Sequence, residues 1–128
     1  PHVLENVDVR DGADGKKVTV FWSLGNFVSG QIEKPPMLGG MAKLTLEKTG
    51  DACKVTEYSL TPLVTHRAPN PSMSVYKLSD YTEELASQNA IRNAPGCGDF
   101  TLQYCYDLVG QILGEGFDAN EGILKGTL

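Results

Sequence analysis

Residues 16–28 decide the fold, and they read Lys16-Lys17-Val18-Thr19-Val20-Phe21-Trp22-Ser23-Leu24-Gly25-Asn26-Phe27-Val28. The β-branched and aromatic residues predict a strand, and the nearly unbroken apolar run at residues 18–22 predicts that this strand is central and buried on both faces. Gly25 and Asn26 tolerate positive φ, so we expect a turn or bulge directly after the strand. A strand that ends in such a kink can deliver polar groups to a site. A core strand followed by an ordinary tight turn is the plainer interpretation of the same pattern.

The segment before this strand predicts its partner in a hairpin. Val7 and Val9 alternate with polar residues, as expected for a short strand that starts near residue 5. A polar, glycine-rich connection then leads to the central strand, which favours an antiparallel hairpin with a longer loop. Asp11 and Asp14 lie in this connection, but the EF-hand spacing with its terminal Glu is absent, so we expect a solvated turn there and no calcium site.

Two further strands are expected after an irregular loop at residues 29–40. Leu44 and Leu46 alternate with polar residues, which predicts one buried face and one solvated face. The next strand covers residues 54–60. Pro62 is expected to end this strand or to place it at an edge of the sheet, because proline cannot donate a ladder hydrogen bond.

Two segments are expected to be irregular. Residues 61–71 have the composition of a loop, and His66 beside Arg67 is expected at the surface, because no partner for a catalytic or ligand role can be identified from the sequence. Residues 117–128 form a polar, glycine-containing tail that ends with a short apolar pair, and we expect this tail to dock only loosely.

Helices are expected only in the last third of the chain. Asp80 and Glu83 have the spacing of a capping box and predict the start of a helix over about residues 80–92. A second helix is predicted over about residues 101–113, where apolar residues recur at helical spacing, and Gly114 is expected to end it.

The predicted fold class is therefore α+β. A mostly antiparallel sheet of about four strands (residues 5–62) is followed by the two helices (about 80–92 and 101–113), and this order favours an antiparallel sheet over alternating β-α units. We expect a single domain over residues 1–128, with a β-rich part (1–78) and a helical extension (79–128).

Composition excludes several classes of function. The formal net charge of −5 argues against nucleic acid or an anionic membrane as a partner. No apolar run approaches the roughly 20 residues that a membrane helix requires, and phosphate-loop, Rossmann and nucleophile-elbow motifs are absent. Cys53, Cys97 and Cys105 lack zinc-site spacing; we expect three reduced thiols that are partly buried, in preference to one disulfide and a free thiol.

Two motifs in this order and spacing resemble a known family. They are Pro1-His2-Val3-Leu4 and, after the hairpin, Ser23-Leu24-Gly25-Asn26-Phe27. Together they are similar to the CapA (PgsA-like) poly-γ-glutamate capsule biosynthesis proteins, in which a Gly-His-His-Pro-His-Val segment precedes a hairpin that leads into Ser-Leu-Gly-Asn-Phe. The Gly-Gly-Met-Ala-Lys-Leu-Thr-Leu and Tyr-Ser-Leu-Thr-Pro-Leu segments resemble the closing sheet of that family. The resemblance covers roughly residues 1–80. Because the chain starts at Pro1, inside the first motif, we expect it to be a piece of a longer protein.

The resemblance implies the fold and the site of calcineurin-type metallophosphoesterases. The chain would form half of an α/β sandwich, beside a pocket in which His, Asp and Asn ligands hold two metal ions. His2 would be the last histidine of that ligand set, and Ser23, Gly25 and Asn26 would line the pocket. The other ligands would come from a missing amino-terminal half, since a metal site requires several protein ligands. We therefore expect no cofactor and no activity in this part alone, and a divalent metal in the full-length parent. The alternative for His2 is an exposed terminal imidazole.

Two functions from different classes follow from this resemblance. The first is a scaffold or binding role in the synthesis or export of the capsule polymer poly-γ-glutamate. The second is a metal-dependent phosphoesterase or related hydrolase, of which this chain is the carboxy-terminal half. An interaction module without a pocket of its own is a third interpretation.

Partners and location also follow from the resemblance. The missing amino-terminal half would be the main partner. If the central strand normally pairs with strands of that half, the chain alone exposes a long apolar sheet edge, which would favour a homo-oligomer. Neither nucleic acid nor membrane contact is expected from this segment. The resemblance places the parent protein outside the cytoplasm of a bacterium, anchored to the membrane.

Overall fold

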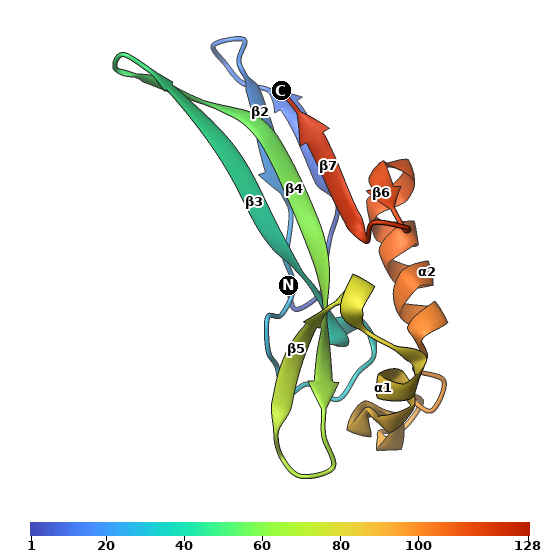
Figure 1. The fold of residues 1–128 in the computed structure, drawn as a ribbon. Coiled ribbons are helices and arrows are strands. Elements are labelled where there is room, and N and C mark those ends of the chain that lie inside the picture. Colours follow the sequence, from blue (N-terminus) through green and yellow to red (C-terminus); the bar gives the residue numbers. More distant parts are fainter.

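The computed structural model describes all residues from 1 to 128 and has the predicted α+β class with antiparallel pairing. Strands β1 (Val7–Asp11) and β2 (Lys17–Phe21) form a separate hairpin. A five-stranded sheet contains β3 (Leu38–Thr49), β4 (Ala52–Arg67), β5 (Met73–Lys77), β6 (Phe117–Asp118) and β7 (Ile123–Thr127). The helix α2 (Leu102–Leu113) lies beside β7, and the short helix α1 (Glu83–Gln88) lies near the far end of β4 (Figure 1).

The central strand of the molecule is β4, although its extension past Pro62 contradicts the sequence prediction. It pairs with β3 through residues 52–64, with β7 through residues 57–60 and with β5 through residues 63–67. Pro62 is tolerated because its partner Gly40 donates its amide to Leu24 O (2.7 Å), away from β4. A pair whose amides point outward carries no ladder hydrogen bond. On the other side of β4, residue 62 lies between the residues that pair with β7 and those that pair with β5, so the missing N–H of proline leaves no ladder hydrogen bond unmade.

The strand that the sequence places at the centre is instead a half-exposed outer strand. In β2, Val18 is 47% exposed, and Trp22 just after it is 46% exposed. The opposite face of β2 packs on the main sheet through Phe21, whose ring lies edge-on to Tyr58 at 6.4 Å. Both faces of β2 carry apolar residues, although only one face packs on the main sheet and the other lies at the surface. For this reason the sequence pattern resembles that of a strand buried on both faces.

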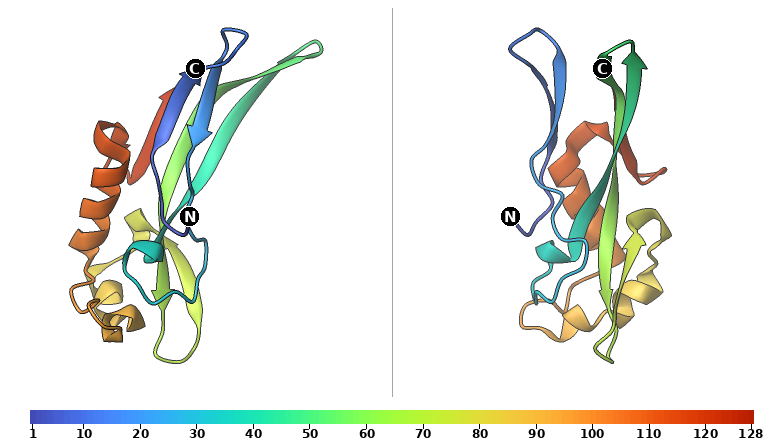
Figure 2. Two further views of the ribbon diagram at one scale, coloured as in Figure 1. Left: turned by 180° about the vertical axis from the view of Figure 1, so that it is seen from behind. Right: turned by 90° about the vertical axis from the view of Figure 1, so that its left-hand side faces the viewer.

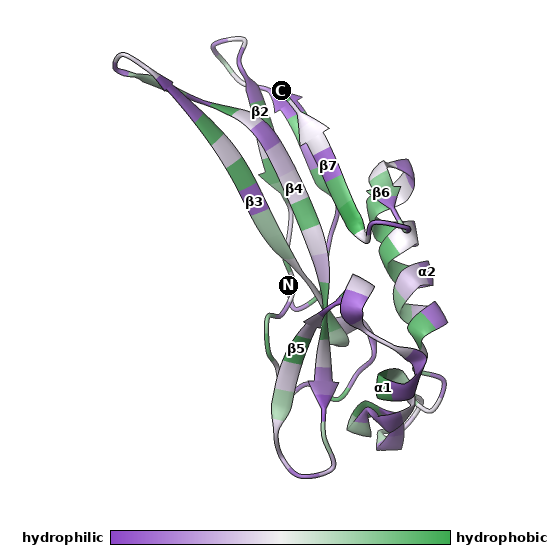
Figure 3. Ribbon diagram, viewed as in Figure 1, coloured by the Kyte–Doolittle hydropathy of each residue, from purple (hydrophilic) through white to green (hydrophobic).

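The outer half of the molecule consists of two layers that diverge. Figure 2 shows the β1–β2 hairpin as a layer in front of β3 and β4, with the tips of the two layers apart. The predicted buried face of β3 is therefore open at this end, where Leu44 is 45% and Leu46 is 62% exposed. The hydropathy colouring shows apolar and polar bands alternating along β3 (Figure 3). The alternation was predicted correctly, but the burial of one face was not.

The helical region contains the two predicted helices, one of them shortened. The helix α2 agrees with the predicted range; Thr101 caps it by accepting the Tyr104 amide (3.0 Å), and Gly114 ends it with a φ of 64°. The helix α1 is capped by Thr82, and not by Asp80 as predicted. It stops at Asn89, because this side chain accepts the Ile91 amide (3.0 Å) and starts a separate 3₁₀ turn.

The carboxy-terminal tail is part of the sheet, and the expectation of loose docking was wrong. Leu124 in β7 is 6% exposed and belongs to the hydrophobic core. Gly126 lies opposite Tyr58, and a Cβ at this position would come within 2.2 Å of the tyrosine ring. Glycine thus leaves room for the ring at this point of β7, where a side chain would force the ring to move. The remaining core is contributed by the sheet and the helices, mainly Leu38, Leu60, Val64, Phe100 and Val109.

The three cysteines are free thiols, as expected. Cys97 and Cys105 are buried, and Cys53 is exposed near the tip of the β3–β4 hairpin. Burial raises the pKa of the Cys105 thiol to about 12, so this cysteine is a packing residue that stays protonated at neutral pH. No helix has the length and apolar character needed to cross a membrane.

Candidate functional site

The two motifs that carry the family resemblance lie side by side. Leu4 and Leu24 form an isolated antiparallel bridge, and the Glu5 amide donates to Ser23 O (3.0 Å). On its other side, the second motif meets the start of β3 through a bridge between Gly25 and Gly39. The kinked segment at residues 23–27 is therefore held between the first residues of the chain and the main sheet.

Glycine is required at the kink for two reasons. Gly25 has a φ of 63°, which L-residues with a side chain rarely adopt. A Cβ at this position would also lie 2.8 Å from Leu4 N and 2.9 Å from Leu38 O. On the facing strand, a Cβ at Gly39 would lie 2.0 Å from Asn26 O. The positive φ expected at Gly25 is thus observed, in a residue that bridges to Gly39 and is not part of an assigned turn, and the close approach of three backbones explains why glycine lies here.

Asn26 is the polar centre of the site and contacts His2. Its Oδ1 lies 2.9 Å from His2 Nδ1. Its Nδ2 donates to Gln31 Oε1 (2.8 Å) and to Pro36 O (3.3 Å). The amide is half-buried, whereas His2 is exposed. Two of the residues assigned to one pocket by resemblance, His2 and Asn26, are therefore in direct contact.

The hydrogen-bond pattern of Asn26 determines the tautomer of His2. Because Nδ2 faces the backbone carbonyl oxygen of Pro36, which can only accept, Oδ1 must be the atom that faces the imidazole. A neutral His2 then carries its proton on Nδ1 and donates it to Asn26. This leaves Nε2 with a free lone pair and no hydrogen-bond partner within the chain. Histidine ligands of metals are oriented in the same way, by donating their other N–H to an oxygen.

Ser23 has a structural role in the turn. Its Oγ accepts the Gly25 amide (3.1 Å) and lies within 3.4 Å of Pro1 O as a donor. The hydroxyl is thus engaged on both sides and stabilises the approach of the first motif to the kink. Ser23 and Gly25 hold the backbone, while His2 and Asn26 present side-chain polar atoms.

The chain supplies few metal ligands at this site. Among the 128 residues there is no group of three or more His, Cys, Asp or Glu side chains that could hold a metal ion. His2 offers one nitrogen, and Asn26 uses its oxygen to orient that nitrogen. Since zinc and related ions take about four ligands, a metal at this position would need further ligands from residues outside this chain.

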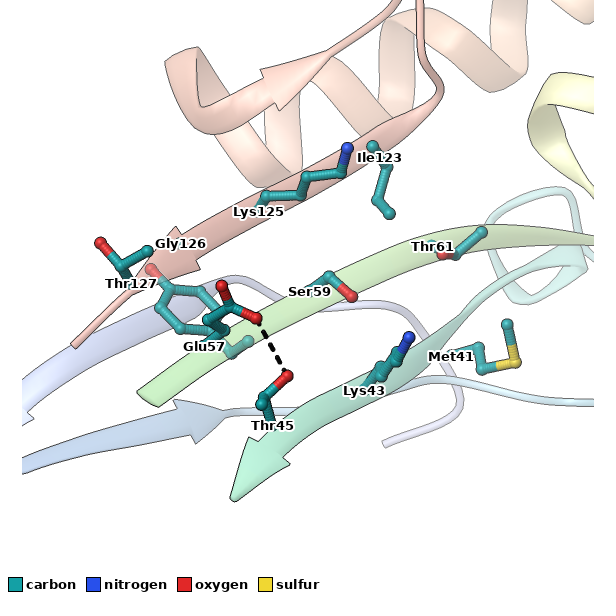
Figure 4. Close-up of a pocket in the computed structure, with 11 residues that line it drawn as sticks. Met41, Lys43, Thr45, Glu57, Ser59, Thr61, Ile123, Lys125, Gly126 and Thr127 are labelled. Carbon is teal, nitrogen blue, oxygen red and sulfur yellow. Dashed lines mark hydrogen bonds between the residues drawn. The ribbon is translucent and has the colours of Figure 1, made fainter. Parts of the chain in front are cut away.

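A shallow hollow of 580 Å³ lies on the outer face of the main sheet, away from His2 and Asn26. Alternate residues of three strands line it, and Figure 4 shows Lys43 of β3 and Lys125 of β7 on either side of Ser59. Lys125 is paired with Glu121 (2.7 Å), and the Glu57 carboxylate accepts the Thr45 hydroxyl (3.1 Å). The hollow is therefore a mixed polar surface with Lys43 as its one cation outside an ion pair.

The sequence reasoning missed a buried polar network around His66. His66 is 8% exposed, which corrects its expected surface position. Its Nδ1 lies 2.9 Å from Tyr81 OH, and Asn89 Nδ2 donates to the same oxygen (3.1 Å). Asn89 also donates to Thr65 O (3.0 Å). The network joins β4 to the helical region, and its partners lie too far apart in sequence to be recognised there.

Comparisons of this chain with protein-family models, with curated proteins and with solved structures gave no match. Of the predicted site residues, the structure brings His2, Ser23, Gly25 and Asn26 together. Gln31 and Gly39 also belong to this site and were not predicted. The Gly39-Gly40 pair is a sequence signal that could have indicated a close backbone approach.

Proposed function

We propose that this chain is the carboxy-terminal part of a CapA-like capsule biosynthesis protein, with a scaffold or binding role in the synthesis or export of poly-γ-glutamate. The observation that carries the proposal is the 2.9 Å contact between His2 Nδ1 and Asn26 Oδ1. It links the two motifs on which the resemblance rests. The β1–β2 hairpin, whose register continues through the Leu4–Leu24 bridge, brings the two motifs opposite each other. The support for the proposal is that the polar side chains of both motifs meet at this point, at His2 and Asn26.

The proposed role of this chain is to provide one wall of a binding site. Gly25 and Gly39 let three backbone segments approach closely, and Asn26 holds the His2 ring with Nε2 free. The rest of the wall would come from the amino-terminal half of the parent protein. In this proposal the parent is anchored to the membrane of a bacterium and works outside the cytoplasm.

A metal-dependent phosphoesterase is the second candidate, and the free Nε2 of His2 favours it. A divalent metal bound there would activate water and polarise a phosphoryl oxygen. Asn26 would then act as the positioning residue that keeps His2 in the ligand-competent tautomer. The chain alone supplies one nitrogen ligand, so we expect turnover only from the full-length protein.

Substitutions at His2 and Asn26 in the full-length protein test both candidates. We expect His2→Ala and Asn26→Leu to lower polymer output in the producing cells, while Asn26→Asp, which keeps an acceptor for His2, retains it. Asn120→Ala is the matched control, because Asn120 is exposed and its side chain makes no hydrogen bond.

Phosphoester hydrolysis in the presence of manganese or zinc separates the two candidates. For the hydrolase, His2→Ala should lower turnover of an aryl phosphoester by about 10- to 100-fold. For the scaffold, the full-length protein should show no turnover while polymer output still depends on His2. If His2→Ala and Asn26→Leu match Asn120→Ala in both assays, the proposed site is wrong.

A further inference from the structure

The outer edge of β3 is a long strand edge without a partner. Strand β3 lies at the end of the sheet order and pairs only with β4 beyond Gly40. Residues 43–49 are all exposed. In Figure 1 no other segment lies beyond β3 on that side, and Figure 2 shows the same edge facing the viewer in its right-hand view. An exposed edge of this length is a template for pairing with another strand.

The Gly40 amide shows which backbone amides of β3 point away from β4. The Gly40 amide donates to Leu24 O, so it points away from β4. Backbone direction alternates along a strand, and the amides of residues 42, 44, 46 and 48 therefore point outward as well. The register shift near Thr45 does not interrupt this order, because the extra residue, Thr56, lies in β4.

We propose that β3 pairs with β3 of a second copy of this chain, antiparallel, about a two-fold axis at Thr45. Lys43 of each copy then lies opposite Glu47 of the other. Leu44 lies opposite Leu46 of the other, and these two residues have the outward amides that form the new hydrogen bonds. The charged pairs lie on one face of the joined sheet and the leucine pairs on the other, because side chains alternate along a strand.

The charge pattern selects this register among the allowed ones. The two copies can form hydrogen bonds only where residues with outward amides lie opposite each other. The two-fold axis must therefore pass through a residue, and not between two residues. An axis at Lys43 or at Glu47 would place like charges directly opposite each other. An axis at Leu44 or at Leu46 would place Lys43 opposite a threonine. The axis at Thr45 alone matches opposite charges and apolar residues at the same time.

The residues involved are available in the single chain. Lys43 takes part in no ion pair, and Glu47 contacts Lys54 of β4 at 3.1 Å through an exposed carboxylate that can accept a second cation. Pairing would cover Leu44 and Leu46, which are 45% and 62% exposed. The contact is self-complementary and closes after two copies, so the expected product is a dimer and not a fibre.

Sedimentation equilibrium of the 128-residue chain, from micromolar to near-millimolar concentration, tests the proposal. We expect a monomer–dimer equilibrium whose dissociation constant rises roughly tenfold or more in Lys43→Glu, since two attractive pairs become repulsive. Combining Lys43→Glu with Glu47→Lys should restore the dimer. Lys48→Glu is the matched control, because it changes the charge equally but faces Ala42 of the second copy. A chain that stays monomeric throughout, or a dimer indifferent to Lys43→Glu, would overturn the proposal.

Cross-linking tests the register independently of affinity. In a Cys53→Ser background, Thr45→Cys places two thiols opposite each other across the axis, in a pair without hydrogen bonds whose Cα atoms are expected about 4.5 Å apart. Mild oxidation should then give a disulfide-linked dimer. Lys43→Cys in the same background should link far less, because its counterpart is Glu47. Equal linking at both positions would contradict the register, and unchanged urea midpoints would show that all variants fold.

Discussion

Asn26 is the residue on which the candidate site depends, because it satisfies three groups at once. Its side chain bonds His2 at the start of the chain and Gln31 and Pro36 in the loop at residues 29–37. A hydrogen bond of this kind contributes about 0.5–1.5 kcal/mol to stability. An apolar replacement would thus release His2 and loosen the loop at residues 29–37 together, whereas an acidic one keeps the acceptor for His2 and loses only the donor to the loop.

Gly25→Ala should destabilise the chain far more than the same change at Gly15. Both glycines have positive φ (63° and 74°), a conformation that costs a side-chain residue about 1–2 kcal/mol. Only Gly25 is also surrounded by backbone atoms, with Leu4 N and Leu38 O within 3 Å of a new Cβ, while Gly15 faces open space. Urea unfolding of both variants measures the difference. Equal midpoints would mean that the kink is not packed as described.

The buried His66 predicts a loss of stability at mildly acidic pH. Burial lowers the pKa of His66 below its ordinary value of 6.5. The unfolded chain then binds the proton more tightly than the folded chain, so the free energy of unfolding falls as the pH drops below about 6.5 towards the lowered pKa, and is fully regained above 6.5. Urea midpoints between neutral pH and about pH 5 measure this slope, and His66→Gln should flatten it. If the urea midpoint of His66→Gln still falls with decreasing pH, the loss of stability comes from groups other than His66.

At the scale of elements, local signals predicted some segments well and misled at others. The helix α2 was found because its apolar stripe and its glycine stop are local features. Pro62 looked like a strand end because its neighbour Gly40, which has its amide turned away, is 22 residues distant. The carboxy-terminal strand β7 carries only one short apolar pair, and its pairing with β4 is what makes it a strand. Long-range partners of this kind leave no local trace in the sequence.

Leu124→Ala tests the docking of β7. Leu124 is 6% exposed within the core, so its truncation should cost about 2–5 kcal/mol of unfolding free energy. Lys125→Ala is the control, since this exposed side chain contacts only Glu121 and should change stability by less than about 0.5 kcal/mol. If both variants unfold at the same urea concentration, the tail is docked as loosely as its sequence suggests.

At the scale of the whole molecule, the arrangement of layers was the part least accessible to sequence reasoning. The meeting of His2 and Asn26 was anticipated from the family resemblance. The division of the first four strands between two sheets was not anticipated. Phe21 and Trp22 are adjacent apolar residues, but Phe21 packs on the main sheet and Trp22 is exposed. Which of them faces the main sheet depends on Tyr58, far along the chain.

Amide hydrogen exchange should distinguish the two layers. The β1–β2 hairpin is joined to the main sheet mainly at its base, where Gly40 N donates to Leu24 O, and its tip diverges from β3 and β4. Residues with few buried contacts open at lower free energy than the core. We therefore expect the amides of β2 to exchange much faster than those of β4 near Leu60 and Val64, which are fully buried. Equal protection factors would indicate that the layers open as one unit.

The tautomer of His2 shows directly whether Asn26 holds this ring with Nε2 free. Long-range ¹⁵N–¹H NMR of the chain at a pH where His2 is neutral reports which ring nitrogen carries the proton. We expect the Nδ1–H form in the unmodified chain, its loss in Asn26→Leu and its retention in Asn26→Asp. A His2 that carries its proton on Nε2, or that is unchanged in Asn26→Leu, would contradict this expectation.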